Sequence, residues 1–500
     1  MKKYEKITSF LLYILAAIGI LTMLFTATNK YIWADEAFSL KLIRHSYQEV
    51  IRLTAQDVHP PLYYILLKFF VQIGDWLNIS DKSMGSILSS IPTLILMVIS
   101  LTMIRKRWGL FASSIFIFCI TFMSNCLTYG TEIRMYSLGM LFVTLTYIVA
   151  YEIILHRRLR DWLLLLVFGL GAAYTHYFAC IPVAIIYGYL LLWTIIKDRE
   201  QFKKWLLISL ATFMLYLPWL VIVLKQVSQV NGAYWIGDIT IDTIKWYIQY
   251  ILSVNNKSLS TLIEISYICV LVKLILDKNK TTEEKIYTFM GCLVPVLTIL
   301  IGVVVSWLMR PIFVERYILP SLGCFWLCFA IGMSSLRLNK IGSPLILLLL
   351  LCLGGINYKS YLTLEKHQND AMNKVNRVID EQINEETVVL TDSDHIQATL
   401  AYYLPQKIYI FSSNTSDYAQ SVNELMKKVY TNTDNIDTQL LMKELLNGKT
   451  ILYWDTGGKD ELYNKLEELS NGRINFTYID GVNIATLTAS LYKIELNVTP

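Results

Sequence analysis

The sequence predicts a polytopic α-helical membrane protein with a small α/β domain at its carboxyl end. The 500-residue chain is 55% hydrophobic and 17% charged, whereas a soluble protein of this size has about a quarter charged residues. Apolar runs of about twenty residues, each able to cross roughly 30 Å of hydrocarbon, recur from Ile7 to near Tyr358. The composition becomes polar from about Ser360. We therefore expect a membrane domain over 1–358 and a second domain over 359–500.

The amino terminus and the cysteines fit this class. Basic residues precede the first apolar run, and Leu21 to Ala27 lacks a clear small-x-small cleavage site, which predicts an uncleaved signal-anchor. The formal net charge of +5 is small and reflects loop charges, so nucleic-acid binding is not expected. All eight cysteines lie within apolar spans, where cysteine behaves as a small hydrophobe. We expect no disulfide in the second domain, and no Cys/His spacing resembles a zinc site.

The basic clusters predict the topology, because lysine and arginine accumulate on the cytoplasmic side of membrane proteins. Placing every dense basic cluster on the cytoplasmic side requires that the apolar run 61–77 does not cross the membrane. This run begins with Pro60-Pro61 and is broken by Lys68, Gln72 and Asp75. It then lies on the outer face, within a first outer loop over 28–83. The amino terminus is cytoplasmic, the carboxyl-terminal domain is extracytoplasmic, and about eleven spans cross: 7–27, 84–104, 108–128, 134–155, 161–180, 181–196, 203–225, 258–277, 286–308, 316–336 and 342–358.

This topology gathers the most polar loop clusters on the outer side. Ionisable groups that converge at one membrane face predict a binding or catalytic site. The candidate residues are Asp35, Glu36, His59, Glu132, Arg134, Tyr136, His176, Arg310, Arg316 and Tyr317.

Each residue type suggests a role. Asp35 and Glu36 are adjacent, so they point in different directions on any regular element, and such carboxylates act as general bases or hold a divalent cation. Arginine has a planar fork that matches phosphate oxygens, and His176 could hydrogen-bond sugar hydroxyls. Structural alternatives remain for several of them: a helix cap for His59, an interfacial ion pair of Glu132 with Arg134, and a tyrosine belt around His176.

The motifs in their order resemble the GT-C glycosyltransferases. The first outer loop carries Asp35-Glu36 and then His59-Pro60-Pro61-Leu62-Tyr63-Tyr64; Glu132-x-Arg134-x-Tyr136 and Arg316-Tyr317-x-x-Pro320 follow. The resemblance covers about residues 1–340 and is greatest to the bacterial branch related to protein O-mannosyltransferases and the lipid A aminoarabinose transferase. Residues 360–500 match only in general terms.

The resemblance implies transfer of a sugar from a polyprenyl-phosphate donor to a cell-envelope acceptor, either a wall polymer, a lipid or a protein. It implies a catalytic role for Asp35, with Glu36 as its neighbour and Glu132 as a second acidic residue. Relatives of the aminoarabinose type have an acidic residue where this chain has His59. The resemblance therefore leaves a divalent metal cation open, with Asp35, His59 and Glu132 as candidate ligands.

Two other classes of protein compete with a transferase. A transporter or flippase of an envelope precursor predicts inverted repeats and ionisable residues near the bilayer midplane, whereas the spans here are largely apolar through their centres. A membrane-anchored sensor leaves the first-loop motifs unexplained and needs fewer spans.

The carboxyl-terminal region reads as alternating strands and helices, which favours an α/β domain. We expect an amphipathic helix over 365–385, strands at 387–391, 407–411 and 450–454, and helices at 396–404 and 460–469.

Overall fold

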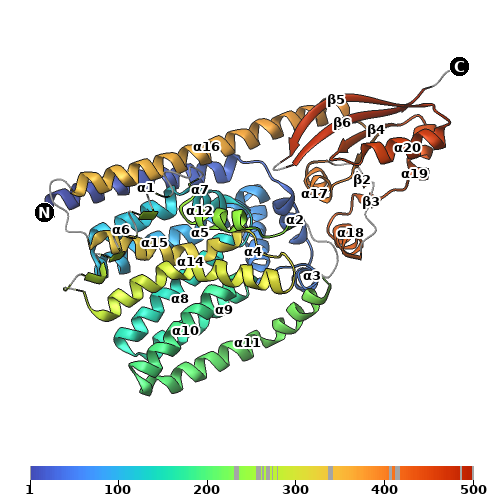
Figure 1. The fold of residues 1–500 in the computed structure, drawn as a ribbon. Coiled ribbons are helices and arrows are strands. Elements are labelled where there is room, and N and C mark those ends of the chain that lie inside the picture. The colour runs from blue at the N-terminus through green and yellow to red at the C-terminus, as the bar shows by residue number, and fades with distance from the viewer. Residues whose placement is uncertain are drawn as a thin grey trace. The chain divides into compact units, whose positions relative to one another are not determined.

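The computed structural model is dominated by helices, and its only sheet among the described residues lies near the carboxyl end (Figure 1). It describes the chain except for residues 1, 230–235, 255–260, 262–263, 266–267, 269–270, 273, 277, 279, 336–341, 405–407, 411–416, 485–486 and 498–500. The chain forms two compact units, which we describe separately. The helical unit comprises Met1–Thr28, Val58–Gln226 and Tyr234–Leu362, and the sheet unit comprises Asn29–Asp57, Val227–Ala233 and Thr363–Pro500.

The structure describes the following helices up to Gln382. They are α1 (Lys2–Asn29), α2 (Ala34–Leu42), α3 (Tyr47–Thr54), α4 (Leu62–Leu77), α5 (Asp81–Ile99), η1 (Ser100–Ile104), α6 (Arg105–Phe122), α7 (Ser124–Thr131), α8 (Tyr136–His156), α9 (Leu159–Ala173), η2 (Tyr177–Ala179), α10 (Cys180–Ile196), η3 (Arg199–Gln201), α11 (Phe202–Gln229), α12 (Ile241–Leu252), α14 (Thr282–Leu308), η4 (Glu315–Ile318), α15 (Leu319–Ser334) and α16 (Gly342–Gln382).

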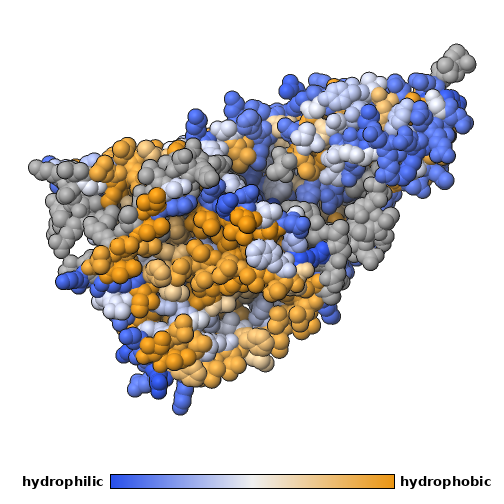
Figure 2. All heavy atoms as spheres, in the orientation of Figure 1, coloured by the Kyte–Doolittle hydropathy of each residue, from blue (hydrophilic) through white to orange (hydrophobic). Residues whose placement is uncertain are grey.

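Eight helical stretches in the described residues are long and apolar enough to cross a membrane. Hydrophobic side chains cover much of the helical unit on the face that Figure 2 shows. One stretch, Asp81–Phe122, contains the expected span 84–104 and most of the expected span 108–128, and the non-helical backbone of Gly109 interrupts it. The expected span 161–180 is the shorter α9, and 258–277 lies partly outside the described residues. The prediction of a polytopic α-helical membrane protein is confirmed.

Helix α15 is the centre of the helical unit. It packs against α6, α8 and α14, and every residue from Leu319 to Met333 is buried. Its Gly323 faces Thr144 of α8 so closely that a Cβ atom on Gly323 would lie 1.8 Å from the threonine hydroxyl oxygen. A glycine at this position therefore permits the close approach of the two helices.

Helix α16 runs beside α1 (Figure 1). The hydroxyls of Thr22 and Tyr358 are 2.6 Å apart, and the Tyr358 ring stacks on Phe122. The expected separation between a last span ending at 358 and an amphipathic helix beginning at 365 is wrong, because α16 is one continuous helix of 41 residues. The composition changes along this helix, but no glycine or proline between 359 and 382 interrupts its backbone hydrogen bonds.

The sheet unit contains a six-stranded sheet in the order β3-β2-β1-β4-β6-β5. Strands β1 (Thr387–Thr391), β2 (Ile408–Ile410), β3 (Thr433–Asn435) and β4 (Thr450–Asp455) are parallel, while β5 (Ile474–Ile484) and β6 (Leu487–Leu496) form an antiparallel hairpin beside β4. Val389 pairs with Leu452 in the central register. The helices are α17 (Asp394–Tyr403), α18 (Asp417–Val429), α19 (Thr438–Leu446) and α20 (Lys459–Ser470).

Part of the first outer loop belongs to the sheet unit. We expected the whole of 28–83 to be part of the membrane domain, but Asn29–Asp57 packs with the carboxyl-terminal residues. Helix α2 contacts both α17 and α18, and the Ile32 amide donates to the Tyr403 hydroxyl at 2.7 Å. These contacts hold the Asp35-Glu36 segment on the sheet unit.

The orientation in the membrane is testable by cysteine labelling. We expect an impermeant thiol reagent applied from outside to label a cysteine at Lys82, at the start of α5, and not one at the exposed Lys106, at the start of α6. Helix α5 is 19 residues long, so it rises about 28 Å, enough to separate these positions by one membrane thickness. The unsubstituted chain, whose cysteines lie in apolar spans, is the background control. Labelling at Lys106 with protection at Lys82 would invert the topology.

Candidate active site

Glu36 is held inside the sheet unit by a buried ion pair. It lies in the first turn of α2, its side chain is fully buried, and its Oε1 is 2.5 Å from Nζ of Lys30. Its other carboxylate oxygen accepts from the backbone amide of Trp33, the residue that precedes α2. A carboxylate at this position satisfies an amide at the helix start and opposes the positive end of the helix dipole. Glu36 thereby fixes the segment leading into α2.

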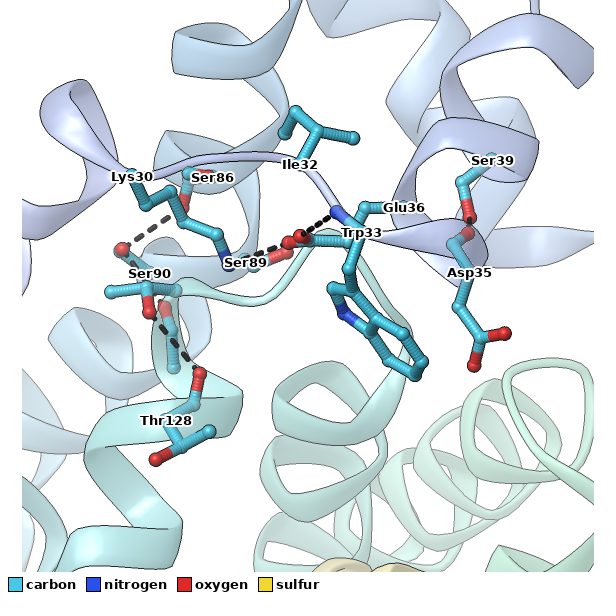
Figure 3. A network of polar contacts seen from close by, with 12 residues as sticks. Lys30, Ile32, Trp33, Asp35, Glu36, Ser39, Ser86, Ser89, Ser90 and Thr128 are labelled. Carbon is cyan, nitrogen blue, oxygen red and sulfur yellow. Dashed lines mark hydrogen bonds and ion pairs between the residues drawn. The ribbon is translucent and has the colours of Figure 1, made fainter. Parts of the chain in front are cut away.

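Asp35 takes a different direction from its neighbour. Figure 3 shows its carboxylate pointing away from the carboxylate of Glu36 and from Lys30, as adjacent positions on a helix require. The side chain is half-buried, and the Asp35 carbonyl accepts from the Ser39 hydroxyl at 2.7 Å within the helix. Asp35 is thus the more accessible of the two carboxylates.

Four loops of the helical unit bring a second group of predicted residues together. They are the His59 loop before α4, the 132–135 loop between α7 and α8, the 174–176 turn after α9, and the segment 309–317 between α14 and α15. The Leu62 amide donates to the Tyr174 carbonyl at 3.1 Å, which ties the first loop to the third. The Tyr247 hydroxyl donates to the Phe313 carbonyl at 2.7 Å, which supports the fourth.

Arg134 lies at the centre of these residues, and we call Arg134, His59, His176 and Arg316 the arginine–histidine cluster. Its Nη2 donates to Nε2 of His59 at 2.7 Å, and its Nη1 donates to the Tyr64 hydroxyl at 3.2 Å. All three side chains are buried. The two nitrogens of one planar guanidinium therefore contact two different residues of the His59-to-Tyr64 motif, which lysine could not do with the same geometry.

His176 connects the cluster to η4, the short helix that precedes α15. Its ring lies 5.8 Å from that of His59, 5.4 Å from that of Tyr136 and 5.0 Å from that of Tyr317 between ring centroids. Its Nδ1 accepts from the Phe178 amide at 3.2 Å, so a neutral His176 carries its proton on Nε2.

The remaining predicted residues complete the cluster and its surroundings. Arg316 is half-buried, with its guanidinium carbon 6.0 Å from the centroid of the Tyr317 ring, and its charge acts on both His59 and His176. Glu132 is buried, and its carbonyl accepts from the Arg134 amide at 2.6 Å. Arg310 is half-buried in the 309–317 segment.

The cluster combines two guanidinium groups with histidines held neutral. The pKa of His59 lies well below its usual value because burial disfavours the imidazolium and because Arg134, His176 and Arg316 oppose a further positive charge. Burial and the same two arginines lower the pKa of His176 to about 3. The positive charge of the cluster therefore resides on its arginines, whose forks suit an anion such as phosphate.

Neutral histidines have a consequence for stability against pH. An unfolded histidine takes up a proton near pH 6.5, whereas folded His59 and His176 resist protonation, so the unfolded state binds more protons in acid. The free energy of unfolding should then fall by up to about 1.4 kcal/mol per pH unit for each histidine as the pH drops below about 6.5.

We expect His59→Gln with His176→Asn to flatten the dependence of the thermal midpoint on pH between about 6.5 and 4. Glutamine retains an acceptor near the position of Nε2, and asparagine retains one near Nδ1. The exposed His367 on α16 provides a control, His367→Gln. An unchanged slope in the double variant would show that these histidines are not the groups responsible.

The candidate metal ligands do not form an evident cation site. In the described parts of the chain, no three His, Cys, Asp or Glu side chains are arranged to hold a metal ion. Nε2 of His59 faces the guanidinium of Arg134, and a nearby fixed cation disfavours a second one. The residues of this cluster fit an anion better than a metal.

Two contributors were not among the predicted site residues. Tyr64 belongs to the His-Pro-Pro-Leu-Tyr-Tyr motif, and that membership was the only signal for its contact with Arg134. Lys30 looks like an ordinary charge at the end of the first span, and nothing in the local pattern identifies it as the partner of Glu36.

Comparison with known proteins supports the fold. No protein-family model and no curated protein sequence matches the chain. Crystal structures of ArnT from Cupriavidus metallidurans match over 96% of this chain and 97% of that chain, with a TM-score of 0.63 and 8% identity for the apo state. For ArnT bound to undecaprenyl phosphate the same coverage gives a TM-score of 0.60 and 10% identity.

The chain is therefore a multi-pass membrane protein with the fold of these ArnT structures, and the fold expected from the resemblance noted in the sequence is confirmed. The likeness to ArnT extends over nearly the full length of both chains, although few residues are identical.

Proposed function

We propose that the chain is an integral-membrane glycosyltransferase that moves a sugar from a polyprenyl-phosphate donor to a cell-envelope acceptor at the outer membrane face. The observation that carries this proposal is the buried Arg134–His59–Tyr64 arrangement, with Arg316 nearby, in a fold that it shares with a protein crystallised with undecaprenyl phosphate. The phosphate of a lipid-linked sugar is an anion of the kind that these arginine side chains bind well.

The chemistry requires two contributions. An acceptor hydroxyl oxygen attacks the anomeric carbon of the sugar, and the bond from that carbon to the phosphate oxygen breaks. Asp35 accepts the proton of the attacking hydroxyl as general base. The bonding electrons leave with the polyprenyl phosphate, whose growing negative charge Arg134 and Arg316 stabilise. Glu36 has a supporting role in this scheme, because Lys30 and the Trp33 amide already occupy its carboxylate.

The neutral histidines would contribute hydrogen bonds. The pKa shifts of His59 and His176 are the reverse of those expected for a general acid poised near neutrality. A donor N–H on Nε2 of His176 could bind a phosphate or sugar oxygen without adding charge. The arginines would then supply the positive charge that binds the phosphate, and the histidines would orient the bound donor.

The direct test is incubation of the purified protein in lipid nanodiscs with a polyprenyl-phosphate sugar and envelope extract. Release of polyprenyl phosphate, together with sugar in the extract, is expected. The competing transporter or flippase would move lipid-linked sugar across proteoliposomes without releasing the lipid phosphate. Loss of one envelope glycan on deletion of the chain would then identify the sugar and the acceptor.

A further inference from the structure

The segment that carries Asp35 is anchored by a tyrosine far away in the sequence. The Tyr403 hydroxyl, at the end of α17, accepts from the Ile32 amide at 2.7 Å and donates to the Ile32 carbonyl at 3.4 Å. Ile32 lies in the extended stretch before α2, where helical hydrogen bonds cannot satisfy either backbone group. One side chain of the sheet unit thus satisfies both, three residues before Asp35.

A second tyrosine of the same unit lies next to the helix that packs against α2. Tyr430 follows the end of α18, the helix that packs against α2, and it is 1% exposed. Its hydroxyl is buried and has no hydrogen-bond partner among the described residues. Burial raises the pKa of Tyr430 well above its usual value, and the negative charge of Asp35 is the largest electrostatic contribution in the same direction.

A buried hydroxyl without a partner is uncommon, and a nearby carboxylate is a favourable acceptor for one. Because Tyr430 stays protonated, it can donate to a charged Asp35 but cannot remove a proton from substrate. The hydroxyl would then limit the rotamers of the carboxylate and set its direction.

We propose that the sheet unit positions the catalytic carboxylate: Tyr403 fixes the backbone before α2, and the Tyr430 hydroxyl orients the side chain of Asp35. This inference rests on the proposed function, because it gives Asp35 the role of general base. It assigns the carboxyl-terminal domain a part in the chemical step through two positioning residues, and it predicts that this domain cannot be exchanged without loss of turnover.

Tyr430→Phe tests the inference, because it removes one oxygen and leaves the ring. We expect kcat to fall by about tenfold, as for loss of one hydrogen bond to a charged group, with the donor Kd unchanged. Tyr403→Phe, which removes both contacts to Ile32, should also lower kcat and leave the donor Kd unchanged. Tyr453→Phe is the matched control, since this buried hydroxyl of the same unit bonds Asp392 and Asp455 instead.

A double-mutant cycle separates positioning from general destabilisation. In the Asp35→Asn background, Tyr430→Phe should lower the residual rate by less than twofold. An equal tenfold loss there, or a loss of donor affinity that parallels the loss of kcat, would overturn the inference.

The same cycle on the thermal midpoint needs no activity. Effects of Asp35→Asn and Tyr430→Phe on stability should be non-additive, since the two side chains interact. Additive effects would overturn the inference even in an active enzyme. Non-additivity in a protein that transfers no sugar would support the contact while refuting the proposed function, so the two failures are distinguishable.

Discussion

Asp35→Asn should abolish sugar transfer while the protein still folds, inserts and binds its lipid-linked donor. The substitution removes one charge at nearly constant volume, and loss of a general base lowers kcat by about 10²–10⁴. The donor Kd should change little, because the residues proposed to bind phosphate are Arg134 and Arg316 of the helical unit. Single-turnover rates and donor binding, measured on the same nanodisc preparation, check both parts.

Two neighbouring variants make this result specific. Glu49→Gln on α3 removes a partly exposed carboxylate from the same segment, paired with Arg52, and should retain wild-type turnover. Glu36→Gln removes the negative charge that pairs with the buried Lys30, which should destabilise the fold by about 3 kcal/mol. If Asp35→Asn turns over normally, Glu36 or Glu132 becomes the candidate base.

The convergence of His59, Arg134, His176 and Tyr317 could be predicted because each lies at the end of an apolar helix. Helix ends are confined to two planes by the bilayer, so the choice of topology already places these residues at one membrane face. What the pattern could not supply was the pairing among them. Whether Arg134 contacts Glu132 or His59 depends on the rotations and tilts of helices, which packing between helices decides.

The association of α2 with the carboxyl-terminal residues was beyond prediction for a different reason. Ile32 and Tyr403 are separated by 371 positions, and hydrophobic periodicity reports only which face of an element is buried. Strands β5 and β6 were missed as well. β5 carries Asn475, Asp480 and Gly481, residue types that are uncommon in strands. Its pairing with β6 supplies backbone hydrogen bonds that the local sequence does not predict.

The continuity of α16 shows why a change in composition is a poor guide to the end of a helix. Polarity rises after Tyr358 because the chain leaves the apolar layer, whereas the helical hydrogen bonds depend only on the backbone. The sequence from 359 to 382 has no glycine or proline and contains many good helix formers. The change from an apolar to a polar sequence was therefore mistaken for the end of a helix.

Arg134 should be the residue whose replacement most weakens donor binding. Arg134→Lys keeps the charge but loses the fork that contacts His59 and Tyr64 at 2.7 and 3.2 Å, so we expect polyprenyl phosphate to bind about tenfold more weakly. Arg134→Ala removes the charge as well and should cost about a hundredfold in Kd. Arg316→Lys should resemble Arg134→Lys, and both proteins should still insert. Arg52→Lys, at an exposed ion pair, is the matched control.

The alternative is that Arg134 only ties the His59 loop to the loop before α8. In that case its replacement lowers the thermal midpoint, while the folded fraction binds donor normally. Pairing Arg134→Met with Glu132→Gln separates the two roles, since a purely structural ion pair predicts that the second neutral residue rescues the first. We expect no recovery of turnover, because the phosphate still lacks its guanidinium. Binding of the donor phosphate should also weaken with added salt in the wild type, and less so in Arg134→Ala.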